Sequence, residues 1–146
     1  MFLIKEDRVL LAMKKRGFGA GRWNGVGGKP EPGESISQAA IRECQEEIAV
    51  TPVIIDKVAE IDFFYTKSEA QDQRVIVYLC KKWLGTPVET EEMAPEWFRF
   101  TEIPYSDMWP DDIYWLSEVL CGKKIKASFY LGEHDKVITH NISLMI

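Results

Sequence analysis

The chain has 146 residues, and we expect residues 1–146 to form a single domain. Hydrophobic residues make up 46% of it and charged residues 28%, which is ordinary for a globular protein. The net charge of −5 argues against non-specific binding to nucleic acid or anionic membranes, but it is compatible with a small anionic substrate, because local basic residues and bound metal change the field of a pocket.

Cysteine usage and the distribution of apolar residues narrow the class of protein further. Cys44, Cys80 and Cys121 are odd in number and include no C-x-x-C pair, so neither a disulfide framework nor a thiolate zinc site is indicated. The first residues lack the features of a signal peptide, and no apolar run approaches the roughly 18 residues that span a bilayer. We therefore expect a cytoplasmic protein with no membrane association and no obligate protein partner.

Apolar runs bounded by turn residues predict alternating strands and helices. A proline favours the first turn of the second helix, and a glycine provides its stop. In chain order, the expected elements are strands near Phe2–Ile4 and Val9–Lys14, a glycine-rich loop, a helix at about Ile36–Ile48, strands at Val53–Tyr65, Arg74–Leu84 and Glu96–Phe100, a second helix from near Pro110 to Gly122, and a closing hairpin of Ala127–Leu131 with Val137–Leu144.

The loop from Gly17 to Gly28 contains six of the ten glycines in the chain. It completes neither of the common phosphate-binding motifs. A Walker A loop would need glycine in place of Trp23 and Ser or Thr in place of Pro30. The Rossmann fingerprint fails as well, because the third glycine is misplaced. We expect these glycines to let the backbone turn tightly and approach a ligand.

The first helix carries a cluster of acidic residues. Ser35 followed by Gln38 predicts a capping box at its start. Three carboxylates, Glu43, Glu46 and Glu47, fall beside one edge of the apolar stripe and repel one another unless cations neutralise them. The predicted buried stripe itself consists of Ile36, Ala40, Ile41, Cys44 and Ile48.

Loop and helix together form a longer pattern of fixed spacing. It reads Gly28, five residues, Glu34, seven residues, Arg42-Glu43, two residues, Glu46-Glu47. Oxygen ligands without sulfur suit Mg²⁺ or Mn²⁺, which bridge protein carboxylates to substrate phosphates. Such a metal can polarise phosphorus and offset charge on a leaving pyrophosphate. Arg42 is expected to orient the helix carboxylates and to pair with Glu46 one turn away.

This pattern resembles the Nudix box of the Nudix hydrolases. The resemblance implies an α/β fold, an α/β/α sandwich around a mixed β-sheet, and hydrolysis of nucleoside diphosphates linked to another group. Two box positions differ, because Cys44 replaces an aliphatic residue and Ala49 replaces the terminal glycine. We expect both changes to affect packing more than chemistry.

Further segments resemble the animal-type oxidised purine nucleoside triphosphatases, which are MutT homologues. The resemblance implies Mg²⁺-dependent hydrolysis of small nucleoside triphosphates such as 8-oxo-dGTP to monophosphate and pyrophosphate, with no binding to nucleic-acid polymers. Two alternatives stay open: a Nudix pyrophosphatase for an unmodified dNTP or a dinucleotide, and a non-catalytic Nudix module that binds nucleotide or protein. The matching segments are residues 8–29, Gly85-Thr-Pro-Val-Glu, Glu92-Met93 and Asp107–Asp112.

Residue by residue, the resemblance implies a metal site and a catalytic site that overlap. The implied metal ligands are Glu43, Glu46 and Glu47 with the Gly28 carbonyl. Glu92 matches a distant acidic residue of the family that would bind metal or orient water; its alternative interpretation is a surface acid in an acidic loop. The implied catalytic set is Glu43, Glu46, Glu47, Arg42 and Glu92, and the sequence leaves open which carboxylate is the general base.

The resemblance also implies a base pocket. Trp109 offers a flat surface for stacking a purine, unless it is simply a core aromatic. Burial and mutual repulsion would raise one pKa of an adjacent acid pair and give a neutral donor beside an anionic acceptor. The alternative is an acidic cap on the second helix, which is compatible with a binding role. The implied substrate-binding residues are Lys14, Phe18, Asn24, Lys29, Phe63, Trp109, Asp111 and Asp112.

Two departures from these relatives bear on the choice of base. The chain starts later than they do, so that a polar residue lining their pocket has no counterpart. Gln73, or a neighbour, stands where they place a methionine under the base. A polar amide there would alter packing or add a hydrogen bond to the purine.

Overall fold

Hairpins of antiparallel strands build most of the sheet in the computed structural model, which describes residues 1–68 and 71–145. Two α-helices and several short 3₁₀ turns connect them. The strands are β1 (Phe2–Lys5), β2 (Arg8–Lys14), β3 (Trp23–Asn24), β4 (Thr51–Tyr65), β5 (Gln73–Leu84), β6 (Met93–Arg99), β7 (Ile125–Leu131) and β8 (Val137–Leu144), and the helices are α1 (Ile36–Ile48) and α2 (Asp112–Leu120).

The order of the strands in the sheet is β3-β2-β1-β5-β4-β7-β8, and β6 pairs with β2. Two of the pairs, β1 with β5 and β4 with β7, are parallel, whereas the hairpin pairs are antiparallel. The sheet is therefore mixed, as predicted. None of the helices in the described residues is long and apolar enough to cross a membrane.

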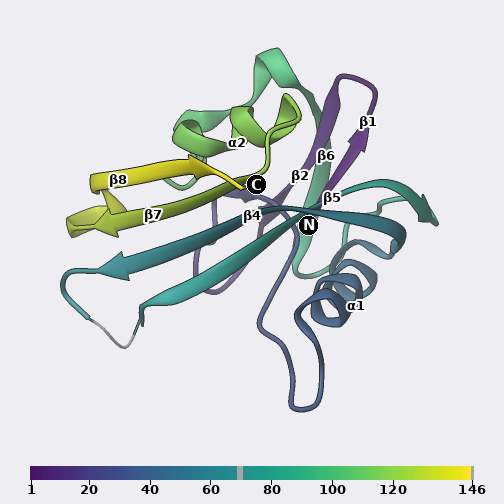
Figure 1. Ribbon diagram of the computed structural model, residues 1–146. Helices are drawn as coiled ribbons and strands as arrows, with labels where there is room; N and C mark the ends of the chain where they lie inside the picture. The colour runs from purple at the N-terminus through teal and green to yellow at the C-terminus, as the bar shows by residue number, and fades with distance from the viewer. Residues whose placement is uncertain (69–70, 146) are drawn as a thin grey trace.

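The two helices cover opposite faces of this sheet (Figure 1). Each face has its own apolar core. Trp115, Leu116 and Val119 of α2 pack into one core, and Cys44 and Ile48 of α1 pack into the other. Strand β1 contributes alternately to both faces, because successive side chains of a strand point in opposite directions. The expected α/β/α sandwich is thus confirmed.

The capping box at the start of α1 forms as predicted. The Gln38 backbone N–H donates to the Ser35 hydroxyl at 3.1 Å, and the Ser35 N–H donates to the Gln38 side chain at 2.9 Å. The predicted buried stripe is wrong at Ile36, whose side chain is half exposed. Ile36 lies in the first turn, which leads in from the exposed segment 29–33, and the buried side of α1 begins at Ala39 instead.

Element boundaries differ from prediction around the predicted base pocket. Strand β3 lies inside the glycine-rich loop and was not expected. Phe100 begins a 3₁₀ turn instead of ending a strand. Helix α2 begins at Asp112, two residues later than expected, with Asp111 as its N-cap residue. The segment before α2 therefore forms a turn, in which the Asp112 N–H donates to the Trp109 carbonyl at 3.1 Å.

Candidate active site

The loop that precedes α1 passes directly against the helix at Gly28. A Cβ atom built on Gly28 would lie 2.5 Å from Oε1 of Glu43, closer than any real Cβ contact. The neighbouring Gly27 has no atom within 4 Å of such a Cβ. A side chain at position 28 would therefore have to move the Glu43 carboxylate or the loop, because the backbone there shares a small space with Glu43.

Arg42 organises the acidic residues around this contact. Its guanidinium donates to Glu34 at 2.8 and 3.0 Å, to Glu43 at 2.9 Å and to Glu46 at 3.1 Å. It also donates to the carbonyl of Lys29 at 3.2 Å, which ties the loop to the helix. The predicted pairing of Arg42 with Glu46 is confirmed. A single cation thus holds three carboxylates that would otherwise repel one another.

Glu47 is the most perturbed carboxylate of the cluster. Its Oε2 atom is buried and has no hydrogen-bond partner among the residues that the structure describes. Burial raises the pKa of Glu47 to about 8, and its hydrogen bond with Glu43 and the charge of Glu43 add to the shift. The charge of Lys14 opposes it. Below that pH, Glu47 keeps a proton that an added cation would displace.

The charge of Glu92 helps to raise the pKa of Glu47, but the Glu92 carboxylate itself pairs with Arg16. Its carboxylate accepts from Nη2 of Arg16 at 2.5 Å and from Nε at 3.1 Å. This ion pair lowers the pKa of Glu92. The loop that carries Glu92 is attached to α1, because the hydroxyl of Thr90 in this loop donates to the Glu47 carbonyl at 2.7 Å.

The oxygen atoms of this cluster are of the type that binds a hard divalent cation, although their side chains do not converge on one point. Within residues 1–68 and 71–145, no three acidic, histidine or cysteine side chains converge as they would on a bound metal. Glu43 and Glu46 turn toward Arg42, and Glu92 turns toward Arg16. The buried, unpartnered oxygen of Glu47 and the carboxylate pressed against Gly28 provide an all-oxygen donor set of the kind that suits Mg²⁺.

A second group of predicted residues meets at Trp109. The rings of Phe18 and Trp109 lie 5.2 Å apart. The guanidinium carbon of Arg22 lies 4.2 Å from the Trp109 ring centroid, a cation–π contact. Arg22 also pairs with Asp135 at 3.5 Å, which links the glycine-rich loop to the turn between β7 and β8. A purine stacking on this face of Trp109 would have to displace Arg22.

The two acids that follow Trp109 are both buried, with 4% and 3% exposure for Asp111 and Asp112. Asp111 accepts from the indole N–H of Trp115 at 2.9 Å, whereas Oδ2 of Asp112 has no hydrogen-bond partner within residues 1–68 and 71–145. Burial raises the pKa of both groups, and the pKa of Asp112 lies well above its usual value because the charge of Asp111 adds to the desolvation. The neutral donor beside an anionic acceptor stays a prediction, and the raised pKa of Asp112 has the direction that it requires.

The other predicted substrate-binding residues are placed less distinctively. Phe63 is buried and stacks on Phe129 at 5.8 Å, so it belongs to the core beneath the pocket. Asn24 uses its side-chain oxygen to accept from the Gly25 N–H at 2.8 Å. The charge of Lys14 acts on the Glu47 carboxyl, and Lys29 is exposed on the loop. Gln73 pairs in register with Phe63, at the edge of the same region.

The contacts of Arg22 with Trp109 and Asp135 were not predicted from the sequence. Arg22 and Asp135 are 113 positions apart, so no local spacing could connect them. The only signal was the presence of an arginine beside Trp23 in a glycine-rich loop.

Comparisons with known proteins identify the family and the fold of the chain. Residues 1–119 match the model of the NUDIX domain. Oxidized purine nucleoside triphosphate hydrolases of Mus musculus and of Danio rerio are each 42% identical over 143 residues, covering 97% of this chain and 90% of the relative. A crystal structure of a MutT protein from Bacillus halodurans superposes with a TM-score of 0.83 at 22% identity, covering 97% of this chain and 94% of that one.

Proposed function

The chain belongs to the NUDIX family of hydrolases, whose members act on small nucleotide substrates, and from that premise we propose that it hydrolyses oxidised purine nucleoside triphosphates such as 8-oxo-dGTP. The products would be the nucleoside monophosphate and pyrophosphate, so that the reaction removes damaged precursors from the nucleotide pool. The mouse and zebrafish relatives carry the name of this activity, and they align with nearly the whole chain.

The observation that supports this substrate best is the buried acid pair beside Trp109. Oxidation of a purine changes which of its edge atoms donate and accept hydrogen bonds. A neutral Asp112 and an anionic Asp111 offer one donor and one acceptor in a place shielded from water. We propose that exchange of the proton within this pair lets one pocket bind differently oxidised purines.

Nudix hydrolases generally use a divalent metal, and we propose Mg²⁺, with Mn²⁺ as a substitute. The ion would be held by the carboxylates of Glu43, Glu46 and Glu47 and the Gly28 carbonyl, with Glu92 as a further donor. Bound there, it would polarise the phosphate and offset the charge of the leaving pyrophosphate.

The chain's own residues would do the remaining work. Arg42 positions the carboxylates through the bonds that it already makes. Glu47, once ionised, would provide an oxygen that can accept the proton of the attacking water. Lys14, whose charge acts on Glu47, would contact the phosphates of the substrate. Lys29 on the loop would do the same.

A substrate panel tests this proposal. Purified protein with Mg²⁺ is incubated with 8-oxo-dGTP, 2-oxo-dATP and the four ordinary dNTPs, and both monophosphate and pyrophosphate are measured. Rapid turnover of the oxidised purines alone is the expected result. Equal turnover of all nucleotides would favour the alternative pyrophosphatase, for which the polar Gln73 near Phe63 is the observation to follow.

The acidic cluster is tested in the same assay. Glu47→Gln should lower kcat by about 10²-fold or more, because it removes an ionisable group that the proposed chemistry requires. Glu46→Gln should do the same. The matched control is Glu118→Gln on α2, where the carboxylate only pairs with Lys123. Full activity of Glu46→Gln and Glu47→Gln would contradict the assignment of the site.

A further inference from the structure

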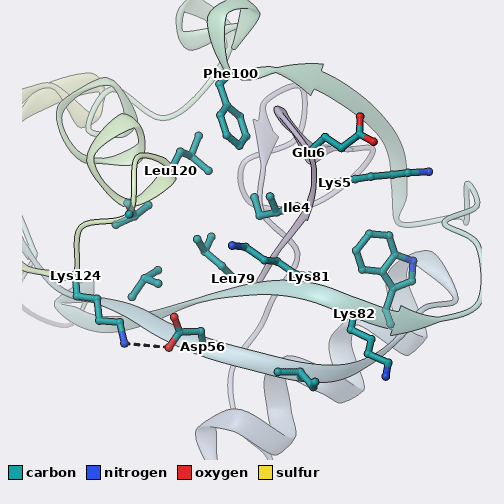
Figure 2. Close-up of a pocket in the computed structure, with 15 residues that line it drawn as sticks. Ile4, Lys5, Glu6, Asp56, Leu79, Lys81, Lys82, Phe100, Leu120 and Lys124 are labelled. Atoms are coloured by element: carbon teal, nitrogen blue, oxygen red, sulfur yellow. Dashed lines mark hydrogen bonds and ion pairs between the residues drawn. The ribbon is translucent and has the colours of Figure 1, made fainter.

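A second cavity lies away from the acidic cluster and the base pocket. Its volume is about 780 Å³, within the range of small-molecule sites. It opens beside the C-terminal end of α2, on the sheet face that α2 covers, between that helix, the β1–β2 turn and strands β4 and β5 (Figure 2). Asp112 lies at the opposite end of α2, about 12 Å away along the helix axis.

The walls of this groove are apolar. Val119 and Leu120 come from α2, Ile4 from β1 and Leu79 from β5, and Phe100 closes the end next to β6. Ile4 and Val119 are buried in the core beneath the groove, so the floor is part of the packed interior and is preformed. Such a surface takes up the apolar body of a ligand without rearrangement.

The charges around the groove are opposite to those of the whole chain. Four lysines and two acids line it, which gives a local excess of positive charge in a chain of net charge −5. Lys124 pairs with Asp56 at 3.1 Å. In the described part of the chain, Lys81 has no carboxylate within ion-pair distance, and the same holds for Lys5 and Lys82. A positive field of this kind selects an anion.

Lys81 brings a positive charge next to the apolar wall of the groove. Figure 2 shows its side chain reaching across the groove toward Leu79, whereas the side chains of Lys5 and Lys82 extend outward at the rim. An ammonium group next to an apolar surface fits a ligand with one anionic group attached to an apolar part. The anionic group pairs with the ammonium, and the apolar part packs against the apolar surface of the groove. A nucleotide triphosphate lacks such a body, which separates this ligand from the substrate.

We propose that this groove is a binding site for a free amphiphilic monoanion, a carboxylate on an acyl-sized or fused-ring apolar body. Lys81 would bind the carboxylate, and the wall of Leu79, Leu120 and Ile4 would bind the apolar part. The inference does not depend on the proposed nucleotide hydrolysis, because the two sites share no residue.

The test uses the full chain and the fluorescent amphiphilic anion 8-anilino-1-naphthalenesulfonate as the probe. One equivalent should bind with enhanced emission. Dodecanoate below its micelle concentration should displace it, whereas dodecyltrimethylammonium should not. Lys81→Met should weaken both anions about tenfold or more, because a charge-assisted bond is lost, and Lys81→Arg should restore most of the affinity. Ile54→Glu, a change at an exposed rim position, should weaken binding through repulsion.

Two comparisons make the test decisive. Lys136→Met removes an exposed lysine outside the groove and should leave probe binding unchanged. All variants should keep the nucleotide activity of the unmodified protein, which shows that they fold. The proposal is overturned if Lys81→Met binds the probe normally, if dodecanoate fails to displace it, or if 8-oxo-dGMP displaces it, since the last result would place the probe in the base pocket.

Discussion

Gly28 and Gly27 stand side by side in the loop before α1, yet only one of them should matter for activity. Because a Cβ at position 28 would lie 2.5 Å from the Glu43 carboxylate, Gly28→Ala must displace either the loop or that side chain. We expect a loss of about 10-fold or more in kcat/KM with Mg²⁺, and weaker Mg²⁺ dependence. Gly27→Ala meets nothing within 4 Å and should behave like the unmodified protein. Steady-state kinetics over a Mg²⁺ titration distinguish the two; equal behaviour would show that the close approach has no role.

Trp109 allows a prediction about the base. Stacking of a base on an aromatic ring contributes roughly 1–3 kcal/mol, so Trp109→Ala should raise KM for 8-oxo-dGTP between about 5- and 150-fold while changing kcat less. Trp109→Phe keeps a ring next to Phe18 and should recover part of the loss. Steady-state kinetics on the two variants give both constants. If Trp109→Ala lowered kcat and left KM alone, the residue would act in positioning the phosphates and not in capturing the base.

How much of the site follows from the sequence depends on whether its residues are neighbours along the chain. Arg42 and Glu46 lie one turn apart on the same helix, so their spacing alone predicts that they meet. Burial of the Glu47 carboxylate depends instead on tertiary packing, which spacing does not reveal. The contact of Arg22 with Asp135 also depends on how the glycine-rich loop folds against the β7–β8 turn.

At the scale of elements, the end of α1 carries a strain that can be measured. Ala49 is the C-cap residue with φ 60° and ψ 34°, the left-handed conformation that glycine adopts without cost. Ala49→Gly should therefore raise the free energy of unfolding by about 0.5–1 kcal/mol, after allowing for the extra freedom of glycine in the unfolded chain. Alanine in place of the terminal glycine of the Nudix box therefore puts strain into the C-cap of α1. Urea unfolding of the variant measures the change.

The other end of α1 supplies the matched comparison. Ser35→Ala removes the hydroxyl that accepts from the Gln38 N–H and should lower the free energy of unfolding by about 1 kcal/mol. The two variants change opposite ends of one helix in opposite directions. A destabilised Ala49→Gly protein would mean that packing around the Ala49 methyl group outweighs the backbone strain.

Long elements were predictable from the sequence, whereas short ones were not. The apolar runs of β4 and β5 extend over 15 and 12 residues, which is long enough for the side-chain pattern to predict a strand. Strand β3 has two residues, too few for any periodicity, and it exists because Trp23 and Asn24 pair with β2. The late start of α2 likewise reflects the turn at Trp109, which depends on tertiary contacts.

At the scale of the whole molecule, the sheet and helix α2 keep three charged regions apart. The acidic cluster of α1 lies on one face, and on the other face the acid pair and the lysine-lined groove lie at opposite ends of α2. A chain of net charge −5 can therefore present a locally positive surface without placing it beside the carboxylates proposed to hold metal.

The buried acid pair should make the stability of the molecule depend on pH. The pKa of Asp112 is raised in the folded state, so between its unfolded value of about 3.9 and the raised value the folded chain binds more protons than the unfolded chain. The free energy of unfolding then falls as pH rises through this window, because ionising Asp112 requires a charge to be buried beside Asp111.

Asp112→Asn tests this dependence, since the amide can still donate to Asp111 but cannot ionise. The variant should match the unmodified protein near pH 4 and become progressively more stable than it as pH rises, by at most about 1.4 kcal/mol per pH unit, until the folded pKa is passed. Chemical unfolding from pH 4 to 9 measures the difference, with Glu118→Gln, which removes a half-buried carboxylate that pairs with Lys123, as a control that should show a much smaller dependence. A difference that stays flat with pH would mean that Asp112 ionises freely in the folded chain, and the donor–acceptor pair proposed for the base pocket would then have no basis.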